Sequence, residues 1–199
     1  MISIFQATGY KLVVVDTEAS HANLTDNYAA IPEEMKSVAK YFNKEYCSEI
    51  TLDELFDQIK LLRAVVGDRA ILRAIHFLEE NTRVEKQICA LNKDNFEAFL
   101  SLVNESGNSS YKYLQNIYTP QNVNEQNVSL ALAISDIFIR EKGKGACRVH
   151  GGGFAGTIQI FLSEELIKEY ESYISKIFKV DSVKILSIRH FGAVCLTDL

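Results

Sequence analysis

The feature that most constrains the fold of this chain is a cluster of glycines between two short β-type stretches. Four of the ten glycines lie at positions 151–156, after GACRVH (145–150) and before TIQIFL (157–162). A strand, a turn and a strand in direct succession predict an antiparallel hairpin. This order differs from the strand, glycine loop and helix of a dinucleotide-binding fingerprint or a P-loop, so the cluster does not indicate either of those sites.

The glycine cluster has two interpretations, and the sequence leaves both open. Ordering a glycine costs more backbone entropy than ordering any other residue, so four of them within six positions need a reason. In the first interpretation they supply positive φ angles for a hairpin turn, and Phe154 is an ordinary tip residue in solvent. In the second, an anion or another segment of the chain approaches the backbone closely.

Apolar patterning predicts further strands at both ends of the chain. GYKLVVVDT (9–17) has the β-branched composition of a buried strand. SVKILSIR (182–189) and GAVCL (192–196) predict two more strands after an amphipathic helix that is expected to begin at Ser163.

The middle of the chain predicts helices. Pro32 suits a first helical turn. Thr51 and Asp94 each precede a glutamate by three residues, the spacing of a capping box, which predicts helices from about 52 and 95. Residues 67–93 carry one long apolar stripe. The pattern predicts an α+β fold in one domain (1–199), with an antiparallel sheet of four or five strands and several long helices packed on one face.

The composition narrows the function classes. With a net charge of -5 the chain lacks the clustered Lys and Arg that neutralise nucleic-acid phosphates, and no apolar run is long enough to span a bilayer. The four cysteines are scattered without Cys-x-x-Cys spacing, which favours buried free thiols over zinc ligands or disulfides. We therefore expect a cytoplasmic protein without nucleic-acid or membrane partners.

Three segments, in order, resemble the galactokinases of the GHMP kinase superfamily. GACRVHGGGFAGT (145–157) resembles the third motif of that superfamily in its galactokinase form, and YKLVVVDTEASHANLTDNY (10–28) resembles the segment that opens the second half of a galactokinase. Residues 72–110 resemble the long helix of the family and its Asn-Glu-Ser segment. The resemblance implies the C-terminal domain of such a kinase, with the N-terminal ATP-binding half as a missing partner.

The resemblance implies a kinase that transfers the γ-phosphoryl group of ATP, with Mg²⁺, to the 1-hydroxyl of galactose or a related sugar. It implies that Tyr28 contacts the sugar, that His21 lies nearby, and that Asn108 and Ser109 border the cleft. It also implies a loop that reaches toward the substrates, formed by Gly151, Gly152, Gly153, Phe154, Ala155 and Gly156. Ala155 replaces a usual glycine, which requires a negative φ there. The catalytic aspartate and nucleotide loop of the family match no segment, so no catalytic residue and no activity of this chain alone are expected.

Two function classes remain open. In the first, the chain is half of a galactokinase. In the second, it is a stand-alone sugar-binding or regulatory remnant that self-associates through the face that an N-terminal half would otherwise cover. For Tyr28, the alternative to a sugar contact is a structural role, in which it lies at the start of a helix and packs on Pro32. Three carboxylate pairs are interpreted as solvated helix faces, and they are Glu33–Glu34, Glu79–Glu80 and Glu164–Glu165.

Overall fold

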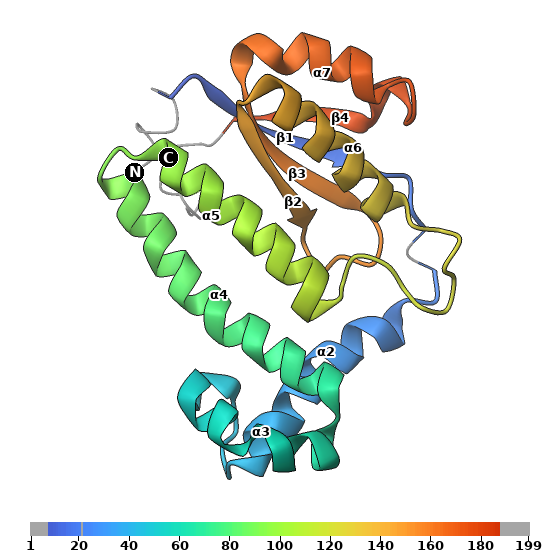
Figure 1. The fold of residues 1–199 in the computed structure, drawn as a ribbon. Helices are drawn as coiled ribbons and strands as arrows, with labels where there is room; N and C mark the ends of the chain where they lie inside the picture. Colours follow the sequence, from blue (N-terminus) through green and yellow to red (C-terminus); the bar gives the residue numbers. More distant parts are fainter. Residues whose placement is uncertain (1–7, 21, 188–199) are drawn as a thin grey trace, which may run out of the picture.

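The sheet has four antiparallel strands. A computed structural model describes residues 8–20 and 22–187 (Figure 1). The strands are β1 (Tyr10–Asp16), β2 (Gly145–His150), β3 (Thr157–Ser163) and β4 (Val183–Leu186), in the spatial order β2–β3–β1–β4. Ile160 of β3 pairs with Val13 of β1 on one side and with Cys147 of β2 on the other. The predicted α+β class with an antiparallel sheet is confirmed.

Helices fill two of the connections between strands. Between β1 and β2 the chain forms α2 (Thr25–Tyr41), α3 (Leu52–Val66), α4 (Asp68–Asn92), α5 (Phe96–Ser109) and α6 (Asn127–Lys142), with a 3-10 turn at Cys47–Glu49 and a π-helical turn at Ser110–Leu114. Between β3 and β4 it forms a 3-10 turn (Glu164–Leu166), α7 (Ile167–Ile174) and a second 3-10 turn (Val180–Ser182). The resulting order is the split β-α-β arrangement of strand, helix, strand, strand, helix and strand.

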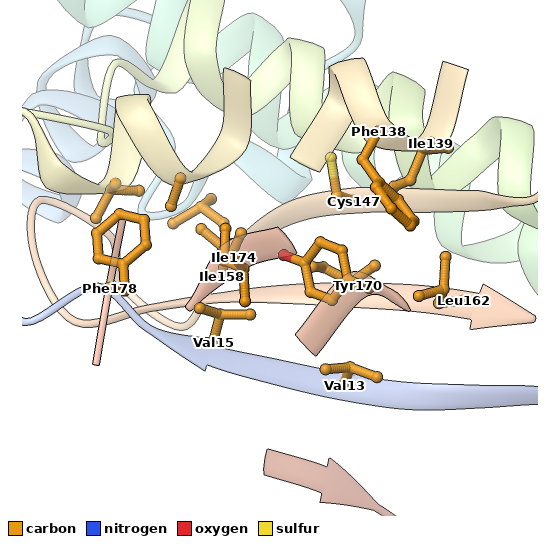
Figure 2. Packing of buried hydrophobic residues seen from close by; sticks show 14 of the residues in the cluster. Val13, Val15, Phe138, Ile139, Cys147, Ile158, Leu162, Tyr170, Ile174 and Phe178 are labelled. Atoms are coloured by element: carbon orange, nitrogen blue, oxygen red, sulfur yellow. The ribbon is translucent and has the colours of Figure 1, made fainter. Parts of the chain in front are cut away.

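One face of the sheet packs against α6 and α7 (Figure 2). Val13 and Ile158 point from the sheet toward Phe138 of α6 and Tyr170 of α7, and all four side chains are buried. Burial raises the pKa of the Tyr170 hydroxyl, which forms a hydrogen bond of 2.7 Å with Ser135. The one polar atom that Tyr170 brings into this layer therefore has a partner, as a buried tyrosine requires.

The opposite face is covered by α5 and the C-terminal end of α4. Ala146 and Phe161 are paired across β2 and β3, and the Phe161 ring lies 5.3 Å from that of Phe99. Apolar residues on both faces of the strands require cover on both sides, so the expectation that the long helices pack on one face is wrong. A separate apolar cluster around Leu55 and Leu62 joins α2, α3 and the start of α4, away from the sheet (Figure 1).

Capping signals locate two helix starts. Thr51 Oγ1 accepts the Glu54 N–H at 3.2 Å, and the Glu54 carboxylate accepts the Thr51 N–H at 2.7 Å, so the capping box predicted there is confirmed. At the start of α5 the cap is Asn95 and not Asp94, because the Asn95 side chain accepts the Ala98 N–H at 3.0 Å.

Helix α2 begins seven residues earlier than Pro32 predicts. Pro32 lies inside α2 and not in its first turn. A proline has no N–H to donate within a helix, which is why the sequence favours a start at that position. The extra turns before Pro32 are stabilised by tertiary contacts, above all those of Tyr28 with the glycine cluster.

Strand β2 is an edge strand, and α5 covers its outer side. Asn104 of α5 accepts the Cys147 N–H through its side-chain oxygen at 3.0 Å. Arg148 donates from Nε to the Val149 carbonyl at 3.2 Å. Gly107 makes this approach feasible, since a Cβ there would lie 3.0 Å from the Cys147 carbonyl oxygen.

Some predicted features lie outside the described residues, namely His21, the strand at 192–196 and Cys195. Of the other cysteines, Cys47 and Cys147 are buried and Cys89 is exposed. Among the helices of the described ranges, none combines the length and the apolar character needed to cross a membrane.

Candidate functional site

The glycine cluster forms the connection between β2 and β3, which we call the glycine loop (residues 151–156). Gly151, Gly153 and Gly156 have φ angles of +71°, +80° and +87°. Phe154 also has a positive φ, of +58°, whereas Ala155 does not, which suits its methyl group. Three of the four glycines therefore occupy backbone conformations that disfavour other residues. Gly152 does not, and a different reason explains it.

Tyr28 packs directly on the glycine loop. It lies in the first turn of α2, its hydroxyl donates to the Gly153 carbonyl at 2.8 Å, and its ring meets that of Phe154 edge-on at 5.4 Å between centroids. A Cβ on Gly152 would lie only 2.8 Å from Cε1 of the Tyr28 ring. Burial raises the pKa of the Tyr28 hydroxyl, so it stays a neutral donor at pH 7. Gly152 is thus a position of close approach.

A second residue, Asn116, approaches the loop from its inner side and was not among the residues predicted from the sequence. Its backbone carbonyl accepts the Phe154 N–H at 2.5 Å, and its side-chain Nδ2 donates to the Gly152 carbonyl at 3.1 Å. A Cβ on Gly153 would overlap the Asn116 backbone oxygen. The one sequence feature that could have pointed to Asn116 is its place between the helical stretch and the polar segment 119–127.

Several polar groups of the glycine loop are engaged within the chain. The Phe154 and Ala155 N–H groups donate to Asn116 and Gly153, and the Gly156 carbonyl accepts from both the N–H and the hydroxyl of Thr17. Phe154 is 6% exposed. It is therefore not a solvent tip, and the N–H groups of Phe154 and Ala155 are not available to an anion. The close approach is made by other segments of the same chain.

Two cavities lie beside Phe154. One, of about 840 Å³, lies between residues 18–20 and 22–24 on one side and the segment 119–127 on the other. It is lined by Glu18, Ser20, Asn23, Gln121, Asn122 and Asn127 among others. The other, of about 240 Å³, is lined by Arg69 and Arg73 among others. Both arginines form ion pairs with Glu34, so the interpretation of Glu34 as part of a solvated face is wrong.

Asn108 and Ser109 lie apart from the glycine loop. Asn108 lines a cavity of about 410 Å³ between α5, α6 and β2. Ser109 is buried and forms a hydrogen bond of 2.9 Å with Nδ1 of His76. Burial lowers the pKa of His76 to about 4, so this histidine is a packed, neutral group.

A cluster of partly buried charges joins α4, α5 and β2 next to His76. Glu80 forms ion pairs with Arg83 and with Arg148, the latter at 3.3 Å, and accepts a hydrogen bond from Ser106. Burial raises the pKa of Glu80, but the Ser106 hydroxyl and the two arginines outweigh it, so that pKa is lowered overall. Glu80 is therefore not part of a solvated face, contrary to the interpretation from sequence. The sequence feature that could have indicated this cluster is Arg148, an arginine within the otherwise apolar strand β2.

In the part of the chain that the structure describes, no three His, Cys, Asp or Glu side chains are arranged to hold a metal ion. The chemistry of the site around Tyr28 and the glycine loop is that of hydroxyl, amide and aromatic groups. Such groups suit an uncharged ligand rich in hydroxyls.

Comparison with known proteins finds galactokinases that are similar to this chain. No protein-family profile matches the chain. The galactokinase of Thermotoga petrophila is 28% identical over 173 residues, which cover 83% of this chain and 44% of that protein. The galactokinase of Clostridium acetobutylicum is 29% identical over 169 residues, which cover 82% of this chain and 40% of that protein. The chain thus spans less than half the length of these curated relatives.

The fold has a counterpart among solved structures. Lactococcus lactis galactokinase, solved in complex with galactose, superposes with a TM-score of 0.71 at 17% sequence identity. The match covers 90% of this chain and 45% of that one. The helices and the four-stranded sheet described above therefore have the arrangement found in part of a galactokinase.

Proposed function

Because this chain is homologous to the C-terminal half of galactokinases, we propose that it is the sugar-facing half of such an enzyme. The complete enzyme would transfer the γ-phosphoryl group of ATP to the 1-hydroxyl of galactose. The observation that supports this proposal is the contact between Tyr28 and the glycine loop. These segments are 125 residues apart in the sequence, resemble two separate substrate-contacting parts of the family, and meet at a hydrogen bond of 2.8 Å.

The cavity of about 840 Å³ beside Phe154 supports a sugar ligand. Asn23, Asn122 and Asn127 line it, together with two carboxylates, those of Glu18 and Glu125. Side-chain amides both donate and accept hydrogen bonds, which matches the hydroxyls of a pyranose. Phe154, which also lines this cavity, adds apolar surface on which a sugar ring can pack.

ATP and Mg²⁺ belong to the complete enzyme in this proposal. The described residues offer no three-ligand metal group, and the Phe154 and Ala155 N–H groups are engaged inside the chain. The residues present therefore do not fit an ATP–Mg²⁺ site by themselves, and we assign no step of the transfer to them. Phosphoryl transfer needs the nucleotide cradle, the metal ligands and the carboxylate together, so the partner of this chain is an N-terminal kinase half. A cytoplasmic location and a role in galactose metabolism are parts of the same proposal.

The proposal is tested by complementation. The purified chain should show no ATP-dependent phosphorylation of galactose above background, and adding the N-terminal half of the Thermotoga petrophila galactokinase should restore it. Tyr28→Phe should weaken the restored activity, whereas Tyr118→Phe, a substitution of a partly exposed tyrosine, should not. Turnover by the chain alone would refute the half-enzyme reading. Galactose binding and dimer formation without any gain from an added half would instead support the stand-alone remnant.

A further inference from the structure

The inner side of the glycine loop is held by a residue that the family resemblance does not assign. We propose that Asn116 is a positioning residue, which fixes the backbone of residues 152–154 in the conformation that Tyr28 contacts. This inference rests on the proposed substrate-facing role of the loop. It makes the loop a clamped segment with Tyr28 on one side and Asn116 on the other.

The contacts of Asn116 span the tightest part of the loop. Its carbonyl accepts the Phe154 N–H and its Nδ2 donates to the Gly152 carbonyl, so two successive peptide units are bound to one residue. Asn116 is 2% exposed, which removes competition from water. Phe154 has a left-handed φ that is unfavourable for a residue with a side chain. The Asn116 bond and the burial of the Phe154 ring together stabilise that conformation.

The position of Asn116 is set by a buried arginine. Gln115, directly before it, is left-handed with φ +56°, and its N–H closes the π-helical turn on the Ser110 carbonyl at 2.8 Å. The preceding Leu114 carbonyl accepts Nε of Arg73 at 3.2 Å. The Arg73 side chain is 3% exposed, so this contact lies inside the molecule.

The same arginine connects Asn116 to the helix that carries Tyr28. Arg73 lies 2.9 Å from the carboxylate of Glu34, and Glu34 and Tyr28 both belong to α2. The two sides of the clamp are therefore fixed relative to each other through one ion pair and one hydrogen bond.

The chemistry at position 116 requires an amide. Nδ2 faces the Gly152 carbonyl, which needs a donor, and Oδ1 is buried without a hydrogen-bond partner among the described residues. An aspartate of the same shape would place a carboxylate oxygen against the Gly152 carbonyl. Asn104 provides the matched control, because there the side-chain oxygen is the acceptor for the Cys147 N–H and an aspartate retains that function.

The test measures loop order in the chain itself, by amide hydrogen exchange followed with NMR. In Asn116→Asp the Phe154 amide should exchange about ten-fold faster than in wild type, which corresponds to about 1.4 kcal/mol. In Asn104→Asp it should be unchanged. Asn116→Ala keeps the backbone acceptor and should give a smaller increase, so it decides the question if Asn116→Asp does not fold. Unchanged Phe154 exchange in the folded variants would overturn the inference.

A functional readout separates positioning from simple stability. In the complemented enzyme, Asn116→Asp should raise the KM for galactose at least several-fold, and Asn104→Asp should not, even when the two variants are compared at equal folded fractions. Equal KM values would overturn the positioning role. If the wild-type chain gives no complementation at all, the proposed function fails, and the exchange of the Phe154 amide still decides whether Asn116 holds the loop.

Discussion

Replacing Gly153 with alanine separates the two reasons for glycine in the loop. At φ +80° an L-residue is strained by about 1 kcal/mol. The new Cβ would also overlap the backbone oxygen of Asn116, so the turn at 114–116 has to withdraw. Withdrawal breaks the bonds of Asn116 to Phe154 and Gly152, each worth about 1 kcal/mol. We expect a total loss of about 3 kcal/mol in the free energy of unfolding.

Gly151→Ala is the matched control. Gly151 has nearly the same φ, +71°, but a Cβ there would meet no atom within 4 Å. It should therefore lose only the strain, about 1 kcal/mol. Urea denaturation followed by far-UV circular dichroism gives both losses from the shift in midpoint at constant slope. Equal losses for the two variants would refute the close approach and leave positive φ as the whole reason for the glycines.

Three further results are expected. Gly152→Val should displace the Tyr28 ring, which a Cβ would meet at 2.8 Å, and lower kcat/KM in the complemented enzyme while the isolated chain stays folded; unchanged kinetics would refute a functional role for this close contact. The pKa of His76 is about 4 in the folded chain, against an ordinary value of 6.5, so the unfolded chain binds this proton at a higher pH than the folded chain does. The contribution of His76 to the free energy of unfolding is therefore fully present above pH 6.5, and it should fall by about 3 kcal/mol as the pH drops to 4. His76→Gln should remove that part of a pH series of thermal melts, and an unaltered profile would contradict the assignment. Glu80→Gln should cost about 1–3 kcal/mol in denaturant titrations because it leaves the partly buried Arg148 without a carboxylate partner, while Arg83 keeps Glu79. Glu79→Gln, at the more exposed carboxylate, should cost about 0–1 kcal/mol, and similar losses would show that the cluster is solvated.

The parts of the fold that depend on local pattern could be predicted from sequence. The hairpin of β2 and β3 follows from two β-type stretches separated by a short glycine-rich turn, and antiparallel pairing is the only geometry such a short connection allows. The start of α3 follows from Thr51 and Glu54, whose reciprocal hydrogen bonds need nothing beyond four consecutive residues.

The parts that depend on tertiary contacts could not. Pro32 marks a helix start by its own chemistry, yet α2 begins earlier because Tyr28 is held by a loop more than 120 residues away. Glu80 has the spacing of a solvated helix position, and only its apposition to Arg148 on β2 reveals the buried cluster. Helix periodicity cannot show which charged residue faces a second element.

The candidate site divides in the same way. The glycines predicted a close approach or a turn, and the structure contains both. Gly151 is required only for its positive φ, whereas Gly152 is required only because the Tyr28 ring leaves no room for a Cβ. Asn116 was not foreseeable, because nothing in its neighbourhood indicates that the turn after a π-helix returns to the β2–β3 connection. Long-range proximity of this kind is a property of the folded chain.

A second chain would find it difficult to lengthen the sheet at β2. An uncovered edge strand presents unpaired N–H and C=O groups that recruit strands from other molecules, which is how ordered aggregates begin. In this chain the Asn104 amide occupies the Cys147 N–H, the Arg148 guanidinium occupies the Val149 carbonyl, and α5 lies alongside. An intruding strand would have to displace both side chains and the helix. The edge next to the glycine loop is thus protected against β-type polymerisation.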